Sequence, residues 1–156
     1  MNFLQTLLAN AVFMSAFWGW LAAQTIKTIL YVVFNKEFDP ERLVGSGGMP
    51  SSHSATVSAL AASTALKYGV GGFEFPMAFF FAFIVMYDAR GVRRETGKQA
   101  SIINELVEEF QEMGHTFENL QDIGQLKELV GHTPLQVGVG CILGIIVAFI
   151  VCGIML

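Results

Sequence analysis

Long apolar stretches separated by one polar block constrain this chain more than any other feature of its sequence. Residues 3–34 are almost continuously apolar or small, interrupted only by Gln5, Asn10, Gln24 and Lys27. A helix needs about 20 apolar residues to cross the hydrocarbon core of a bilayer. Because residues 3–34 exceed one span but are too few for two spans with a turn, we expect one long or bent transmembrane helix.

Three further stretches have the composition of membrane helices. Residues 51–68 are rich in Ala, Ser and Thr, which allow close helix contact inside a membrane bundle, and Pro50 is typical of the first position of a helix. Residues 75–87 are dominated by Phe, and residues 134–156 are apolar or small throughout. The sequence therefore predicts an all-α integral membrane protein, a bundle of about four transmembrane helices in a single domain over residues 1–156.

The polar block, residues 89–131, carries most of the charge of the chain. Within it, residues 99–113 place Ile102, Leu106 and Phe110 at helical spacing with glutamates on the opposite side, which predicts an amphipathic helix on the bundle or at the membrane surface. Charged residues make up only 14% of the chain, against about 25% in a soluble domain. The net charge of −4 offers no basic face for nucleic acid.

The first candidate for a functional site is the segment 47–53, Gly-Gly-Met-Pro-Ser-Ser-His. Glycines such as Gly48 before a helix expose backbone N–H groups, and a helix N-terminus attracts an anion through those groups and its dipole. Ser51 and Ser52 add hydroxyl donors, and His53 adds a titratable group. The same residues are also an ordinary helix start, in which His53 is a solvated cap residue. No Gly-Lys-Thr follows, so nucleotide binding is poorly supported.

The second candidate directly follows the third apolar stretch. Asp88 is followed by three arginines, Arg90, Arg93 and Arg94, which could clamp a phosphate through paired hydrogen bonds. The alternative is a positively charged membrane anchor on the cytoplasmic side, which needs no substrate. A carboxylate near the end of a span usually has a partner, so Asp88 is harder to explain as a residue without a role.

A third candidate opens the last apolar stretch, in the segment 131–134, Gly-His-Thr-Pro. His132, like His53, lies at the N-terminal end of a helix that enters the bilayer, whereas we assign no role to His115. Lys27 completes the set. A lysine in an apolar helix either extends its ammonium group to the interface or faces a polar cavity, and here both remain open.

Together these residues resemble the type 2 phosphatidic acid phosphatase (PAP2) superfamily, and more closely its small divergent membrane branch. The superfamily pattern is a Lys with a following Arg-Pro, then Pro-Ser-Gly-His, then Ser-Arg, His and Asp. The segment 50–53, Pro-Ser-Ser-His, is similar to the second motif, and the segment 132–137 with Gly140 resembles the end of the third. Lys27 corresponds to the lysine of the first motif.

Three positions depart from this pattern. No Arg-Pro follows Lys27 at the usual spacing, and the polar block separates the arginines from His132. Gln136 occupies the position of the Asp that orients the nucleophilic histidine. A glutamine carbonyl can hold a tautomer but cannot stabilise an imidazolium by charge, so either Asp88 or another carboxylate takes that role or activity is reduced.

The resemblance implies a membrane phosphatase that hydrolyses a phosphomonoester or pyrophosphate of a lipid without a metal or other cofactor. His132 would attack phosphorus and form a phosphohistidine, while His53 would protonate the leaving alkoxide and then activate water. Asp88 is the carboxylate expected to assist them. The resemblance assigns phosphate binding to Lys27, Gly48, Ser51, Ser52, Arg90, Arg93 and Arg94.

Two other classes of function stay open. A non-catalytic lipid-phosphate binding or carrier protein would use the same anion pocket, which Gln136 favours, and a structural membrane subunit would need neither histidine. The loops that carry the three candidate clusters contain most of the basic residues, so the positive-inside rule predicts a site on the cytoplasmic face of a bacterial-type plasma membrane. With four spans the chain is expected to form a homodimer around its site.

Overall fold

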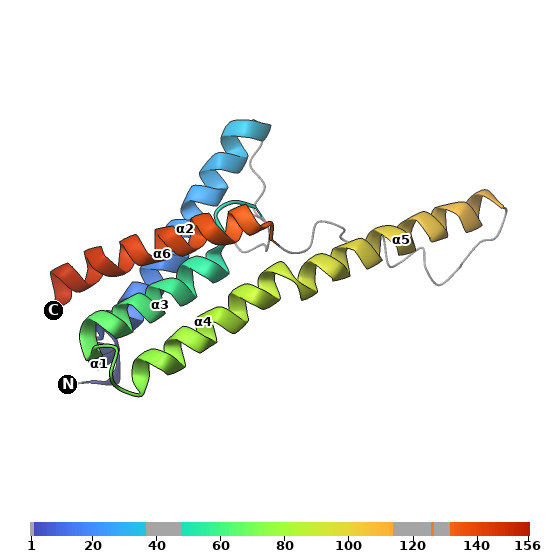
Figure 1. The fold of residues 1–156 in the computed structure, drawn as a ribbon. Helices are drawn as coiled ribbons and strands as arrows, with labels where there is room; N and C mark the ends of the chain where they lie inside the picture. The colour runs from blue at the N-terminus through green and yellow to red at the C-terminus, as the bar shows by residue number, and fades with distance from the viewer. Residues whose placement is uncertain (1, 37–47, 114–125, 127–131) are drawn as a thin grey trace.

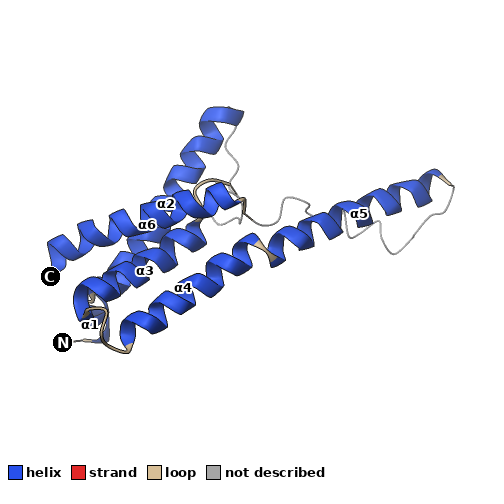
Figure 2. Ribbon diagram, in the orientation of Figure 1, coloured by secondary structure: helices blue, strands red, loops and turns tan. Residues whose placement is uncertain are grey.

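The computed structural model describes residues 2–36, 48–113, 126 and 132–156, with the backbone alone for residues 92–94. Helices joined by loops make up this part of the chain, with no strand in it (Figure 2). The prediction of an all-α protein is confirmed for these residues. In chain order the helices are α1 (Phe3–Leu8), α2 (Ala11–Asn35), α3 (Ser52–Tyr68), α4 (Glu74–Arg90), α5 (Val92–Glu112) and α6 (Pro134–Met155).

The first apolar stretch forms two helices, where one long or bent helix was predicted. The break lies at Asn10, whose side-chain oxygen accepts hydrogen bonds from the backbone N–H groups of Val12, at 3.0 Å, and Phe13, at 3.4 Å. An asparagine in this position caps the N-terminus of a helix, so α2 begins anew at Ala11. It ends at Lys36, which adopts a left-handed conformation with φ of 55°.

Three helical segments of the described chain are long and apolar enough to cross a bilayer: α2, the run from Glu74 to Glu112, and α6. The fourth predicted span, α3, has only 17 residues and is rich in hydroxyl side chains. It lies among α2, α4 and α6, which pack against it from three directions (Figure 1). A short polar helix can sit in a membrane bundle when neighbouring helices separate it from lipid.

Small residues bring α2 and α6 close to α3. Gly19 of α2 and Gly144 of α6 both face the turn of α3 that contains Ala55, which is fully buried. A Cβ atom at Gly144 would overlap the carbonyl oxygen of Ala55, and one at Gly19 would lie 3.0 Å from it. The hydroxyl of Ser63 donates to the backbone of α3 itself, so this polar group is satisfied inside the bundle.

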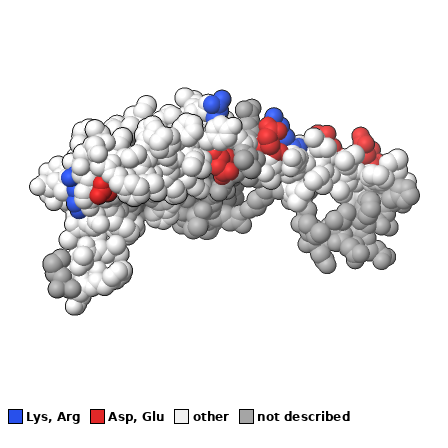
Figure 3. All heavy atoms as spheres, turned by 60° about the horizontal axis from the view of Figure 1, so that its bottom comes forward, with Lys and Arg blue, Asp and Glu red and all other residues white. Residues whose placement is uncertain are grey.

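The run from α4 into α5 continues past Gly91, and α5 projects away from the bundle (Figure 1). The predicted amphipathic helix is therefore longer than expected, since it begins at Val92 and not at residue 99. Of the two predicted positions, on the bundle or at the membrane surface, the first is wrong, because among the described helices α5 contacts only α4. Lys, Arg, Asp and Glu are sparse over the bundle and more frequent toward α5 (Figure 3).

Candidate active site

Three chain segments meet at one end of the bundle, opposite the two termini (Figure 1). The backbone N–H of Ser51, just before α3, donates to the carbonyl oxygen of Gln136 in the first turn of α6, at 3.1 Å. The backbone N–H of His132 donates to the carbonyl oxygen of Ala89, in the last turn of α4, at 3.0 Å. The N-termini of α3 and α6 therefore lie side by side against the C-terminal end of α4.

This arrangement brings the two helix-start histidines together. The ring centroids of His53 and His132 are 5.9 Å apart, with the ring planes inclined by 61°. His132 is buried, whereas His53 is half-buried. The two rings meet edge to face, so both imidazoles can contact one group bound beside them.

The start of α3 is built around Ser51. Its hydroxyl oxygen accepts a hydrogen bond from the backbone N–H of Ser54 at 3.3 Å and lies 3.1 Å from the hydroxyl of Ser54. Ser51 is thus the N-cap, and the predicted helix start at Pro50 is wrong by two residues because Ser52 is the first helical residue. Both serines are buried. The first-turn N–H groups and the positive end of the helix dipole lie beside the histidines.

The start of α6 is held by a reciprocal cap that also contacts His132. The hydroxyl of Thr133 accepts from the backbone N–H of Gln136 at 3.3 Å, and the side-chain oxygen of Gln136 accepts from the backbone N–H of Thr133 at 3.0 Å. The same Gln136 oxygen lies 3.2 Å from Nδ1 of His132. Pro134 is the first residue of α6, as predicted.

Lys27 lies inside the protein, which argues against the first of its two alternatives, an ammonium group extended to the membrane interface. Only 4% of its surface is exposed, and its ammonium group donates to the side-chain oxygen of Gln24 at 2.9 Å. The backbone at Gly48 passes close to the Lys27 side chain, because a Cβ atom at Gly48 would lie 3.1 Å from Cγ of Lys27. With φ of 80°, Gly48 also has a conformation that favours glycine.

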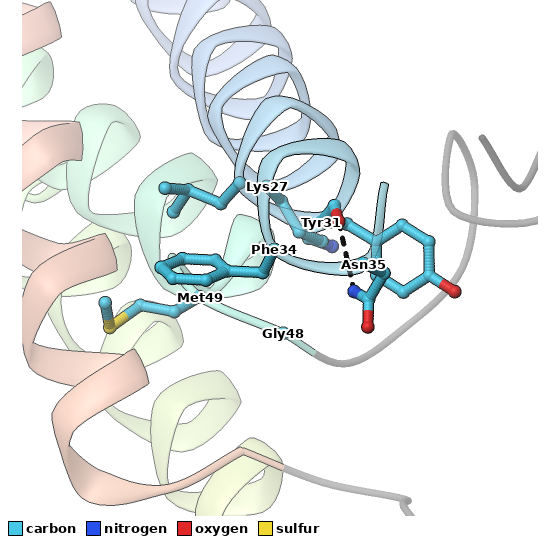
Figure 4. A pocket seen from close by; sticks show the side chains of 7 residues that line it. Lys27, Tyr31, Phe34, Asn35, Gly48 and Met49 are labelled. Atoms are coloured by element: carbon cyan, nitrogen blue, oxygen red, sulfur yellow. Dashed lines mark hydrogen bonds between the residues drawn. The ribbon is translucent and has the colours of Figure 1, made fainter. Parts of the chain in front are cut away.

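A pocket opens beside Lys27, between the C-terminal half of α2 and the segment that precedes α3 (Figure 4). In the figure the side chains of Phe34 and Met49 lie next to each other, and Lys27 extends beside Tyr31. The walls are largely apolar, with a single cation among them. The pocket has a volume of about 220 Å³ and is lined by Lys27, Leu30, Tyr31, Phe34, Asn35, Gly48 and Met49.

The end of α4 contributes the remaining predicted residues. Asp88 is half-buried and Arg90 is exposed, on either side of Ala89, whose carbonyl oxygen binds the backbone of His132. The side chains of Arg93 and Arg94 lie outside the described residues.

Gln24, which sequence analysis missed as a partner of Lys27, could have been found from its position three residues earlier on the same helix face.

The family comparison covers this whole site. A sequence model described as the divergent PAP2 family matches residues 8–147. The chain belongs to the divergent PAP2 family. The resemblance inferred from the motifs is thereby confirmed, and every site residue named above lies within the matched part of this PAP2-family chain.

A relative supports the same membership. The uncharacterized membrane protein YuiD of Bacillus subtilis (strain 168) is 36% identical over 150 residues, which cover 92% of this chain and 95% of the relative. No solved structure matches the chain. Membership in the family and three candidate spans together make this chain a membrane protein.

Proposed function

We propose that this divergent PAP2 protein is a lipid-phosphate phosphatase that removes phosphate from a phosphomonoester or pyrophosphate of a lipid through a phosphohistidine. The observation that carries the proposal is the pair of histidines, 5.9 Å apart between ring centroids, at two adjacent helix N-termini. A lone histidine at a helix start is commonplace. Two that meet at adjacent helix starts, in a protein that also buries Lys27, would supply the nucleophile, the acid and the cation for phosphoryl transfer.

In the first step Nε2 of His132 donates its lone pair to phosphorus, and the bond between phosphorus and the lipid oxygen breaks. His53 gives its proton to that leaving oxygen, so an alcohol or a shorter phosphate departs. In the second step a water oxygen bonds to phosphorus while His53 takes a proton from the water. The N–P bond breaks, its electron pair returns to Nε2, and inorganic phosphate is released.

The non-bridging oxygens need positive charge and hydrogen-bond donors in both steps. We assign this role to Lys27, to Gly48 and to the start of α3 at Ser51 and Ser52. Arg90, with Arg93 and Arg94 beyond it, would contribute further cations from the end of α4. We assign Asp88 to offset the positive charge that these groups accumulate.

The pocket beside Lys27 supports a lipid as the substrate. Its buried ammonium group suits a phosphate, while Leu30, Phe34 and Met49 offer apolar contacts to the first carbons of a chain. The site also lies at the end of helices long enough to cross a bilayer, so a phosphate can bind near the interface while its chain stays in the membrane. We place this site on the cytoplasmic face and expect a homodimer in the membrane.

One observation favours a second candidate function, a lipid-phosphate binding or carrier protein without turnover. The side chain against Nδ1 of His132 is the neutral Gln136, which stabilises an imidazolium less than a carboxylate does. A carrier would bind lipid phosphate through the same residues but release no phosphate. Trapping of a phosphohistidine in the presence of substrate therefore separates the two candidates.

The direct test is phosphate release by the purified protein in lipid vesicles, with phosphatidate, phosphatidylglycerol phosphate and an isoprenyl pyrophosphate as substrates. We expect His132→Ala to abolish release with whichever lipid is hydrolysed. His115→Ala is the matched control, because it removes the remaining histidine of the chain, to which no role is assigned. Equal release by the His132 variant and the unmodified protein would overturn the proposal.

A further inference from the structure

The side-chain oxygen of Gln136 lies close to two groups, the backbone N–H of Thr133 and Nδ1 of His132. The first of these contacts determines the protonation of the second. The backbone N–H of Thr133 lies 3.0 Å from this atom. A backbone amide can only donate a hydrogen bond, so the group it faces must be the carbonyl oxygen of the glutamine and not its NH₂. The cap of α6 thus fixes which way round the Gln136 amide is placed.

The orientation of this amide determines the tautomer of His132. Nδ1 of His132 lies 3.2 Å from the same carbonyl oxygen, which can only accept. Nδ1 must therefore carry the hydrogen, and in a neutral imidazole the lone pair is then on Nε2. We infer that Gln136 is a positioning residue, which holds His132 as the Nδ1–H tautomer and so presents Nε2 as the nucleophile of the proposed phosphatase.

The backbone around this pair makes the arrangement rigid. The backbone carbonyl oxygen of Gln136 accepts a hydrogen bond from the backbone N–H of Ser51 at the start of α3. The backbone N–H of His132 donates to the carbonyl oxygen of Ala89 at the end of α4. The hydroxyl of Thr133 holds the N–H of Gln136. Three helices thereby fix the ring and the amide that faces it, as a preorganised nucleophile requires.

A carboxylate in this position would both orient the ring and stabilise its positive charge, whereas a neutral amide does only the first. Gln136 orients the ring and selects the tautomer, but it adds no charge to stabilise the imidazolium that exists while Nε2 bears a phosphoryl group. The phosphohistidine is therefore less stabilised, and its N–P bond breaks more readily. Gln136→Glu reverses this: it keeps an oxygen acceptor for both Thr133 and His132, and it favours the protonated ring.

The test of the tautomer does not depend on activity. Protein labelled with ¹⁵N-histidine is measured by NMR at a pH of about 8, where an unperturbed imidazole is neutral. Single substitutions of the other two histidines, His53 and His115, assign the signals. We expect the His132 signals of a protonated Nδ1 and an unprotonated Nε2, and Gln136→Leu should convert them to a mixture of tautomers. A protonated Nε2 in the unmodified protein would overturn the inference.

Thr133→Ala is the matched control for a merely structural effect. It removes the hydroxyl that caps α6 but leaves the backbone N–H of residue 133 and the Gln136 amide in place, so the tautomer should not change. If Gln136→Leu does not fold, Gln136→Glu gives the second measurement. It should move the acidic limb of the activity–pH profile upward by about one unit, because more of the nucleophile is protonated. An unmoved limb would contradict the assignment.

This inference and the proposed function can fail separately. The kinetic part rests on the proposed function, whereas the tautomer is a property of the resting protein. An Nδ1–H tautomer without phosphate release would leave Gln136 as the residue that orients His132 and would reject the phosphatase. Phosphate release with the opposite tautomer would keep the phosphatase and reject the role of Gln136.

Discussion

The imidazole rings of His53 and His132 meet edge to face with 5.9 Å between their centroids, although one belongs to the first turn of α3 and the other precedes α6. This pairing depends on the close approach of the two helix starts, which the hydrogen bond from Ser51 to Gln136 holds together. The roles proposed for the two rings differ, and experiments can separate them.

We expect His53→Gln to impair only the steps that need a proton donor or acceptor. Loss of a general acid or base typically costs about 10²- to 10⁴-fold in rate. A substrate with a weakly basic leaving group, such as an aryl phosphate, needs no protonation on departure. The variant should therefore form the phosphohistidine from an aryl phosphate at a rate closer to that of the unmodified protein than from a lipid phosphate. An equal loss with both substrates would contradict a leaving-group role for His53.

Lys27→Met should weaken the binding of phosphate without unfolding the bundle, because methionine keeps most of the length of a buried side chain. A hydrogen bond to a charged group contributes about 1.5–3 kcal/mol, which corresponds to a change in affinity of roughly 10- to 100-fold. The measurement is inhibition by vanadate, a phosphate mimic. Lys67→Met is the control, since this lysine lies at the end of α3 away from the site. Equal inhibition of both variants would remove Lys27 from the site.

Gly48→Ala tests the close crossing over Lys27. The substitution introduces a Cβ atom 3.1 Å from Cγ of Lys27 and forces a side chain into a left-handed conformation, which costs about 1–2 kcal/mol. We expect a lower thermal midpoint in detergent and lower activity. Gly138→Ala is the matched control, because Gly138 lies in α6 and a Cβ atom there would have no neighbouring atom within 4 Å. An equal thermal midpoint in the two variants would contradict the close contact between Gly48 and Lys27.

Phe34→Ser should distinguish a lipid substrate from a soluble one. Removal of the ring from the pocket wall reduces the apolar area available to a chain, and we expect KM for a long-chain lipid phosphate to rise by about fivefold. Hydrolysis of a short soluble phosphate should not change. Val33→Ser removes an apolar side chain that does not line the pocket, from the same turn of α2, and should affect neither substrate. Equal effects on both substrates would argue against a chain in this pocket.

Some of these features could be predicted from the sequence because they depend on local patterns. Thr133 and Pro134 are a strong helix start, and α6 begins where they predict. His53 and His132 were both predicted at helix starts on the same side, and the structure brings these two helix starts together. The family motifs then indicate the same site.

Other features could not be predicted, because they depend on which residues meet across helices. The burial of Lys27 requires α2 to turn that face toward Gly48, which periodicity in a uniformly apolar helix does not determine. Gly91 favours the end of a helix, but the chain continues from α4 into α5. The role of Gln136 depends on its side-chain oxygen, which lies against both the backbone N–H of Thr133 and Nδ1 of His132, and the sequence does not show this contact.

The central claim is that His132 becomes phosphorylated during turnover. The most direct measurement incubates the protein in vesicles with a ³²P-labelled lipid phosphate, quenches the reaction with alkali, in which phosphohistidine is stable, and locates the label by mass spectrometry. We predict label on His132 in the unmodified protein and in His115→Ala, and none in His132→Ala. Release of phosphate with no label at His132, or label that persists in His132→Ala, would contradict the account.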